Sequence, residues 1–240
     1  MQTTPNTVAE LAVTMPQSIS VLEKLGIDYC CNGHQSIEKA CRAHGITTDE
    51  LLGLIDAVSA PAGESRPWND EPMSAVIRFI VDTHHRYTRD AVDLLRPLAT
   101  KVAGVHGANH AELRQVEKLV YELADDLIPH MLKEEQVLFP YVEALEEASF
   151  LGDQPPVPFF GTARNPVRMM MLEHETVGEK LLEIRAVTGN FELPAEACTS
   201  YRVLFARLEE LEQDIHRHIH LENNILFPRA IAAEESARGE

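Results

Sequence analysis

Residues 130–140 read HMLKEEQVLFP, and residues 218–228 read HIHLENNILFP. Both stretches follow the pattern H-x3-E-x3-L-F-P, in which a histidine and a glutamate are four residues apart. Chance can produce one such stretch, but it is a poor explanation for two that match along their length. The pair therefore predicts an internal repeat, and this repeat decides the fold.

A further histidine lies at nearly the same distance before each stretch. His84 comes 46 residues before His130, and His174 comes 44 residues before His218. Each half of the repeat thus offers one histidine from a first helix and a His-x3-Glu pair from a second helix. We expect two helix pairs of the same design.

Four long segments around these residues have apolar side chains at the i, i+3, i+4 spacing of amphipathic helices, and no strand pattern competes with them. Helices that are apolar on one face and joined by loops pack as a bundle. The sequence therefore predicts an all-α protein whose main part is a four-helix bundle, with helices over about 73–98, 109–147, 166–187 and 195–233.

Glu134 and Glu222 fall on the apolar stripes of their helices rather than on the solvent sides. An isolated buried carboxylate is very costly unless it is paired or neutralised. No Lys or Arg shares these stripes near them, so a bound metal is the expected cation. Residues four apart lie on one helix face, so each His-x3-Glu aims an imidazole and a carboxylate at one point.

The predicted metal ligands are four imidazoles and two carboxylates. Six ligands exceed the four of a closed zinc site, but they suit two ions with two histidines each and both glutamates bridging. Ligation by nitrogen and oxygen without thiolate fits iron or manganese, with zinc also open. An oxo or hydroxo bridge and a small ligand such as O₂ or NO would complete the coordination. The set is His84, His130, Glu134, His174, His218 and Glu222.

Several histidines and acids beside these residues are not expected to bind metal. They lie about 100° or more around the helix from a ligand, which favours solvated or supporting positions. His106, in the loop over residues 104–109, is expected to be exposed. The neighbouring residues are His85, His216, His220, Glu135, Glu173 and Glu175.

Residues 1–58 read as a small helical domain around a turn-rich stretch that contains Cys30 and Cys31. So short a segment holds only a small core, so we expect it to lean on another part of the chain. Residues 59–72, with several prolines and charges, are expected to be a linker, and residues 73–235 to form the bundle.

Cys30 and Cys31 are candidate catalytic residues, as redox or iron-relay thiols. They precede a predicted helix start, where the helix dipole lowers the pKa of a thiol. Adjacent cysteines do not easily form a relaxed disulfide with each other. The alternative is that both are small residues packing the domain, and Cys41 and Cys198 are expected to be buried or incidental.

The composition excludes several classes of function. Lys plus Arg number 21 and Asp plus Glu 38, for a net charge of −17, so no nucleic-acid partner is expected. No apolar run is long enough to span a membrane, and no secretory signal is recognisable. The four cysteines are too few for a disulfide scaffold, which favours a cytoplasmic location with reduced thiols.

These residues resemble those of the hemerythrin-like di-iron proteins. With Asp28-Tyr29-Cys30-Cys31, residues 130–140 and residues 221–229, nearly the whole chain resembles the iron–sulfur cluster repair di-iron family. The resemblance implies a non-haem centre of two iron ions, reactivity with NO and restoration of iron–sulfur clusters damaged by nitrosative or oxidative stress. Damaged iron–sulfur proteins would be its partners. Classical oxygen carriers use five histidines and a mixed Glu/Asp pair, which argues against a plain carrier here.

Other functions stay open at this point. The chain could reduce NO to N₂O as an enzyme, with electrons entering through the cysteine unit from an unknown electron donor. It could bind O₂ or NO as a sensor without turnover, or be a structural zinc bundle. The presence of the cysteine-bearing unit argues against a simple carrier of O₂ or NO, because a carrier needs only the bundle. A homodimer is compatible with the sequence.

Overall fold

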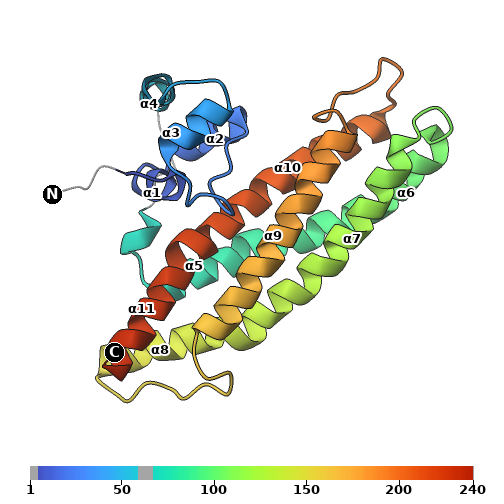
Figure 1. Cartoon of the computed structure of the whole chain (residues 1–240). Coiled ribbons are helices and arrows are strands. Elements are labelled where there is room, and N and C mark those ends of the chain that lie inside the picture. The colour runs from blue at the N-terminus through green and yellow to red at the C-terminus, as the bar shows by residue number, and fades with distance from the viewer. Residues whose placement is uncertain (1–4, 59–66, 240) are drawn as a thin grey trace.

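A computed structural model describes residues 5–58 and 67–239. Its first part holds four short helices, which Figure 1 shows packed against one side of a long helical bundle. They form the small helical domain that the sequence predicts for residues 1–58. They are α1 (Val8–Thr14), α2 (Ser18–Leu25), α3 (Ile37–Ala43) and α4 (Thr48–Ala57).

Side-chain caps define the starts of three of these helices. Thr7 caps α1 and Thr47 caps α4, and in each case a glutamate three residues later returns a bond to the backbone of the capping residue. Ser36 caps α3 by accepting a hydrogen bond from the backbone amide of Lys39. Such caps satisfy amide groups that would otherwise lack partners, and each stabilises its helix by about 1 kcal/mol.

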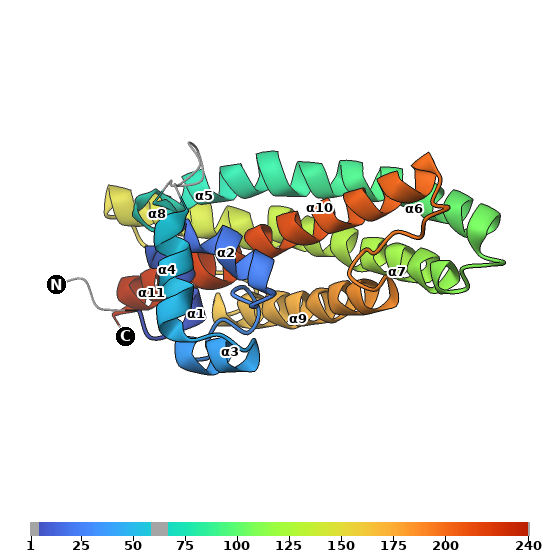
Figure 2. The same cartoon turned by 90° about the horizontal axis from the view of Figure 1, so that it is seen from above.

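Four long helical runs form the bundle, and the predicted all-α four-helix architecture is confirmed (Figures 1 and 2). Helix α6 packs against α7 and α10, and α7 packs against α9. The runs are α5 (Met73–Phe79), η2 (Ile80–His85) and α6 (Arg86–His106); α7 (Glu112–Lys133), η3 (Glu134–Leu138) and α8 (Phe139–Leu151); α9 (Arg164–Val187); and α10 (Thr199–Leu221), η4 (Glu222–Leu226) and α11 (Phe227–Arg238).

Three of the four runs contain a π-helical turn, and these turns are η2, η3 and η4. A π-turn holds one more residue than an α-turn, so it rotates the following residues by about 100° relative to an unbroken α-helix. Such turns are frequent at functional sites. Here each one lies beside the histidines and glutamates that the sequence singles out.

The N-terminal helices share a hydrophobic core with the bundle, as their small size predicts. Buried residues such as Leu22 and Ile55 belong to the same apolar cluster as Leu208 and Ile215 of α10. A half-exposed ion pair between Glu23 and Arg217, 3.1 Å apart, lies at the same junction. The cysteine-bearing unit is therefore seated on the bundle through one continuous core.

The segment expected to be a linker lies partly outside the described residues, because 59–66 are not described. Its remainder contains a short 3₁₀ helix, η1 (Trp68–Asp70). The ring of Trp68 lies 4.3 Å from that of Phe79, and Arg229 donates to the backbone carbonyls of Trp68 and Glu71. Residues 67–72 are thus packed onto the bundle.

Candidate metal centre

Two groups of four buried side chains converge in the middle of the bundle. One consists of His85, Glu134, His218 and Glu222, and the other of His130, Glu134, His174 and Glu222. Within each group the four possible ligand atoms all lie within 4.8 Å of one another. Both groups contain the same two glutamates, which is the arrangement expected of carboxylates that bridge two ions.

Each carboxylate lies near one imidazole from each group and uses a different oxygen for each. Glu134 lies 3.4 Å from His85 Nε2 through Oε2 and 3.4 Å from His130 Nε2 through Oε1. Glu222 lies 2.9 Å from His218 Nε2 through Oε1 and 3.1 Å from His174 Nε2 through Oε2. The four Nε2 atoms therefore point inward, as metal ligands would.

The polar atoms of this centre lack the partners that buried groups need. Among the described residues, three carboxylate oxygens of the centre make no hydrogen bond of good geometry. They are both oxygens of Glu134 and Oε2 of Glu222. Native structures leave few buried polar atoms unsatisfied, and each one calls for an explanation. Four imidazoles and two carboxylates form a donor set that fits divalent transition metals. The residues present therefore fit a pair of metal ions.

His85, not His84, supplies the first imidazole, and this corrects the sequence prediction. His84 lies outside both groups, and its Nδ1 is 3.0 Å from Oδ1 of Asp214. The prediction extended an unbroken α-helical stripe through residues 77–95, but the π-turn η2 ends at His85 and shifts the register by one residue. The other five predicted ligands, His130, Glu134, His174, His218 and Glu222, do come together.

Residues outside the two groups contact the outer nitrogens of three of the four histidines. Glu135 lies 2.6 Å from His85 Nδ1, Glu173 lies 2.8 Å from His130 Nδ1, and Asn223 Oδ1 lies 2.9 Å from His174 Nδ1. An acceptor at Nδ1 keeps the proton there and leaves Nε2 free to bind a metal. Glu135 and Glu173 were expected in solvated or supporting positions, and the structure places both in supporting ones. In the sequence, each of them is adjacent to a predicted ligand, and this position is the signal by which they could be found.

The charges of the centre shift the protonation of its histidines. Burial of His130 opposes its protonation, but the nearby negative charges of Glu134 and Glu222 and the hydrogen bond to Glu173 raise its pKa from 6.5 to about 9. Burial would also raise the pKa of Glu222, but His218 and His174 hold it well below its usual range. The metal-free centre at neutral pH therefore holds ionised carboxylates and a protonated His130.

Metal binding at pH 7.5 is expected to release the proton of His130, because a metal needs the free imidazole nitrogen. Apparent affinity should therefore rise with pH up to about 9. The raised pKa also stabilises the metal-free fold, but with the opposite dependence on pH. This contribution to the free energy of unfolding is complete below pH 6.5 and is lost as the pH rises through about 9.

Calorimetric titration with Mn²⁺ in two buffers of different ionisation enthalpy measures the protons released. The His130→Gln variant is the control, because residue 130 then carries no imidazole to deprotonate. Equal heats in both buffers at pH 7.5 would contradict the raised pKa.

The cysteine pair lies directly beside the bundle. The Cys31 thiol donates to the backbone carbonyl of His174 at 3.7 Å, and the Cys30 and Cys31 sulfurs are 3.8 Å apart. Asp28 organises the loop, since its Oδ1 accepts the backbone amides of Cys30 at 3.0 Å and of Cys31 at 2.9 Å. A Cβ added to Gly178 of α9 would lie 3.6 Å from the Cys31 sulfur, so the thiol fits closely against that helix.

The expectation of a lowered thiol pKa is wrong for Cys30. Helix α3 starts only at Ile37, so its dipole is not directed at the cysteines. The hydrogen bond to the Cys31 thiol, burial and the negative charge of Asp28 raise the pKa of Cys30 well above its usual value. At neutral pH Cys30 is a thiol.

Two other expectations also change. His220 is buried rather than solvated; burial lowers its pKa to about 4, and Asn224 donates to its Nδ1 at 2.9 Å. His106 is the last residue of α6, and its Nε2 lies 3.1 Å from the Cys198 sulfur, far along the helix from the metal groups. Cys198 is exposed, and Cys41 is buried as expected.

Comparison with known proteins places the chain in a family. A family model described as a hemerythrin HHE cation binding domain matches residues 76–230. The chain belongs to this hemerythrin family. A second model, described as a domain of unknown function (DUF542), matches residues 4–59. The hemerythrin match covers both metal groups, and by its description the domain binds cations.

Relatives of similar length share both parts. The iron–sulfur cluster repair protein YtfE of Yersinia pseudotuberculosis is 32% identical over 224 residues, which cover 93% of this chain and 96% of the relative. The YtfE of Edwardsiella ictaluri is 33% identical with the same coverage. That of Salmonella schwarzengrund is 34% identical over 230 residues, or 95% of this chain and 97% of the relative. The resemblance to the repair family is thus confirmed.

No helix among the described residues is both long enough and apolar enough to cross a lipid bilayer.

Proposed function

We propose that the chain holds two non-haem iron ions in the bundle and repairs iron–sulfur clusters damaged by nitrosative or oxidative stress. The convergence of two donor groups on two shared, fully buried carboxylates carries this proposal. The names of relatives that span nearly the whole chain support it. Damaged iron–sulfur proteins in the cytoplasm are its proposed partners.

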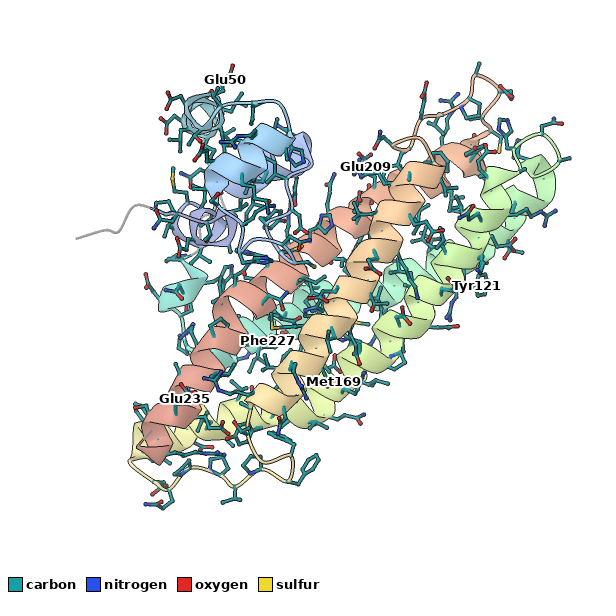
Figure 3. The ribbon with its side chains drawn as sticks, viewed as in Figure 1. Glu50, Tyr121, Met169, Glu209, Phe227 and Glu235 are labelled. Atoms are coloured by element: carbon teal, nitrogen blue, oxygen red, sulfur yellow. The ribbon has the colours of Figure 1, made fainter. Side chains whose placement is uncertain are left out.

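The protein's own residues fix the centre. Iron bound there would supply redox chemistry and a coordination position for a small ligand such as NO or O₂. Glu135 and Glu173 hold a proton on the outer nitrogens of His85 and His130, which orients both rings. The rings of Phe139 and Phe227 stack on His85 at 5.7 Å and on His174 at 6.1 Å, and they exclude water from the centre (Figure 3 labels Phe227).

Cys30 and Cys31 are proposed to act as redox or iron-relay thiols between the centre and an electron donor or client. The closeness of Cys31 to the backbone of His174 supports this role. Because Cys30 is buried and Cys31 is only half-buried, Cys31 is the thiol that a partner meets first.

Metal analysis of protein purified anaerobically from its natural source tests the cofactor. We expect about two iron ions per chain, one for each donor group. The same protein should reactivate an iron–sulfur dehydratase that has been inactivated by NO. Zinc in place of iron, or no reactivation by the iron-loaded protein, would contradict the proposal.

The Cys30→Ala/Cys31→Ala double variant tests the thiols. We expect it to keep its bundle metal and lose repair, because neither cysteine belongs to the two donor groups. The matched control is Cys41→Ala/Cys198→Ala, which removes the other two cysteines, one buried and one exposed. Normal repair by the first variant would reduce the pair to a packing role.

A further inference from the structure

Two neighbouring asparagines fasten the cysteine loop to the last long helical run. Asn223 donates through Nδ2 to the Cys30 carbonyl at 3.2 Å, and Asn224 donates through Nδ2 to the Tyr29 carbonyl at 2.9 Å. Both belong to the π-turn η4, directly after Glu222. The turn therefore holds the backbone of the loop at two successive residues.

The side-chain amides of Asn223 and Asn224 differ in their second partner. Asn223 Oδ1 lies 2.9 Å from Nδ1 of His174, whereas Asn224 contacts Nδ1 of His220, which belongs to neither metal group. Only Asn223 thus bonds both to the cysteine loop and to an imidazole of the centre. Glu135 and Glu173, the Nδ1 partners of His85 and His130, instead accept hydrogen bonds from the bundle residues Arg89 and Lys133.

The orientation of the Asn223 amide is fixed from both sides. His174 Nε2 lies 3.1 Å from Oε2 of Glu222 and 3.0 Å from His130 Nε2, so it is the nitrogen that would bind a metal in the proposed centre. The ring proton then belongs on Nδ1. That N–H needs an acceptor, and the Cys30 carbonyl needs a donor. An asparagine satisfies both with one planar group, and an aspartate would set an oxygen against the carbonyl.

We infer that Asn223 is a positioning residue that couples the setting of the Cys30–Cys31 loop to the orientation of the His174 imidazole. A rigid amide bonded at both ends transmits a shift of the loop to the ring, and a shift of the ring to the loop. The coupling free energy between two sites is the same in both directions. If filling the metal centre shifts the loop, modifying the loop must therefore shift metal binding by the same free energy. This inference rests on the proposed metal centre.

The test follows thiol reactivity in the full-length chain. Cobalt(II) is the probe, because its visible spectrum reports ligand geometry and needs no redox step. A Cys41→Ala/Cys198→Ala background leaves only Cys30 and Cys31 to react with a chromogenic disulfide reagent. We expect the labelling rate to differ about fivefold or more between the metal-free and cobalt-loaded protein, the usual lower range of coupling between sites.

Asn223→Ala should abolish this difference, and Asn224→Ala, which frees the same loop at Tyr29, should keep it. Asn223→Asp keeps an acceptor for His174 and breaks the bond to Cys30, so at saturating cobalt it should still fill the centre and lose the difference in labelling rate. In the reverse direction, bridging the two thiols with an arsenical should shift the cobalt spectrum of the parent and Asn224→Ala proteins but not of Asn223→Ala.

A difference that persists in Asn223→Ala would overturn the inference and assign the coupling to the direct contact between Cys31 and the His174 carbonyl. Equal labelling rates with and without cobalt in the parent would overturn it as well. If cobalt fails to bind at all, the proposed centre itself is wrong, and the failure is recognised before any labelling. Folding of each variant is checked by far-ultraviolet circular dichroism.

Discussion

Replacement of Glu222 by leucine is expected to empty the metal centre and leave the helices in place. Glu222 supplies one oxygen to each donor group, so its loss removes a ligand from both ions at once. Even residues that only orient ligands contribute a factor of about 10 to 100 in metal affinity, and a shared ligand should contribute more. Metal analysis should find the content falling from about two ions per chain to nearly none.

Thermal unfolding gives an independent readout of the same variant. A ligand that binds only the native state stabilises it by about 2.7 kcal/mol at a hundredfold excess over Kd. Chelation should therefore lower the midpoint of the parent protein and leave that of Glu222→Leu unchanged. Glu209→Leu is the control, since Glu209 is exposed on α10 (labelled in Figure 3) and its variant should respond to chelation as the parent does. A Glu222→Leu protein that keeps both ions would refute the bridging arrangement.

Replacement of His85 by glutamine is expected to remove one ion of the two. His85 belongs to the group with His218, which would then keep only three donors, while the group of His130 and His174 stays complete. The metal content should fall from about two ions to about one per chain. The cobalt-loaded variant should show the spectrum of a single type of site.

The adjacent variant His84→Gln is the matched control for this experiment. His84 is also buried and carries the same side chain, but it contacts Asp214 instead of the shared carboxylates. It should therefore retain both ions. Loss of an ion from His84→Gln together with full retention by His85→Gln would restore the assignment that an unbroken helix predicts.

Much of the centre could be predicted because its ligands obey local geometry. Each His-x3-Glu pair lies on one helix face whatever the rest of the chain does, and the repeat doubles the signal. The histidine of the first run was misplaced by one residue because a π-turn changes the helical register, and no apolar pattern in that segment records the extra residue.

The surroundings of the centre depend on contacts between distant parts of the chain. The bond from Asn223 to the Cys30 carbonyl joins residues 193 apart in sequence, and periodicity says nothing about such a pair. The raised pKa of Cys30 has the same origin, because it depends on how the loop folds around Asp28 and is buried. The helices and five of the six residues of the two donor groups could therefore be predicted, whereas the environment of the thiols could not.

The attachment of the cysteine loop to η4 has a consequence for the order of assembly. Chains are synthesised from the N-terminus, and domains generally fold as they emerge from the ribosome. The backbone of the cysteine loop is synthesised more than 190 residues before Asn223 and Asn224, whose side-chain amides hold it: the bonded residues are 193 and 195 apart in sequence. A nascent chain therefore carries its cysteine loop unanchored until η4 has been synthesised, and the finished thiol site marks a chain in which η4 has already docked.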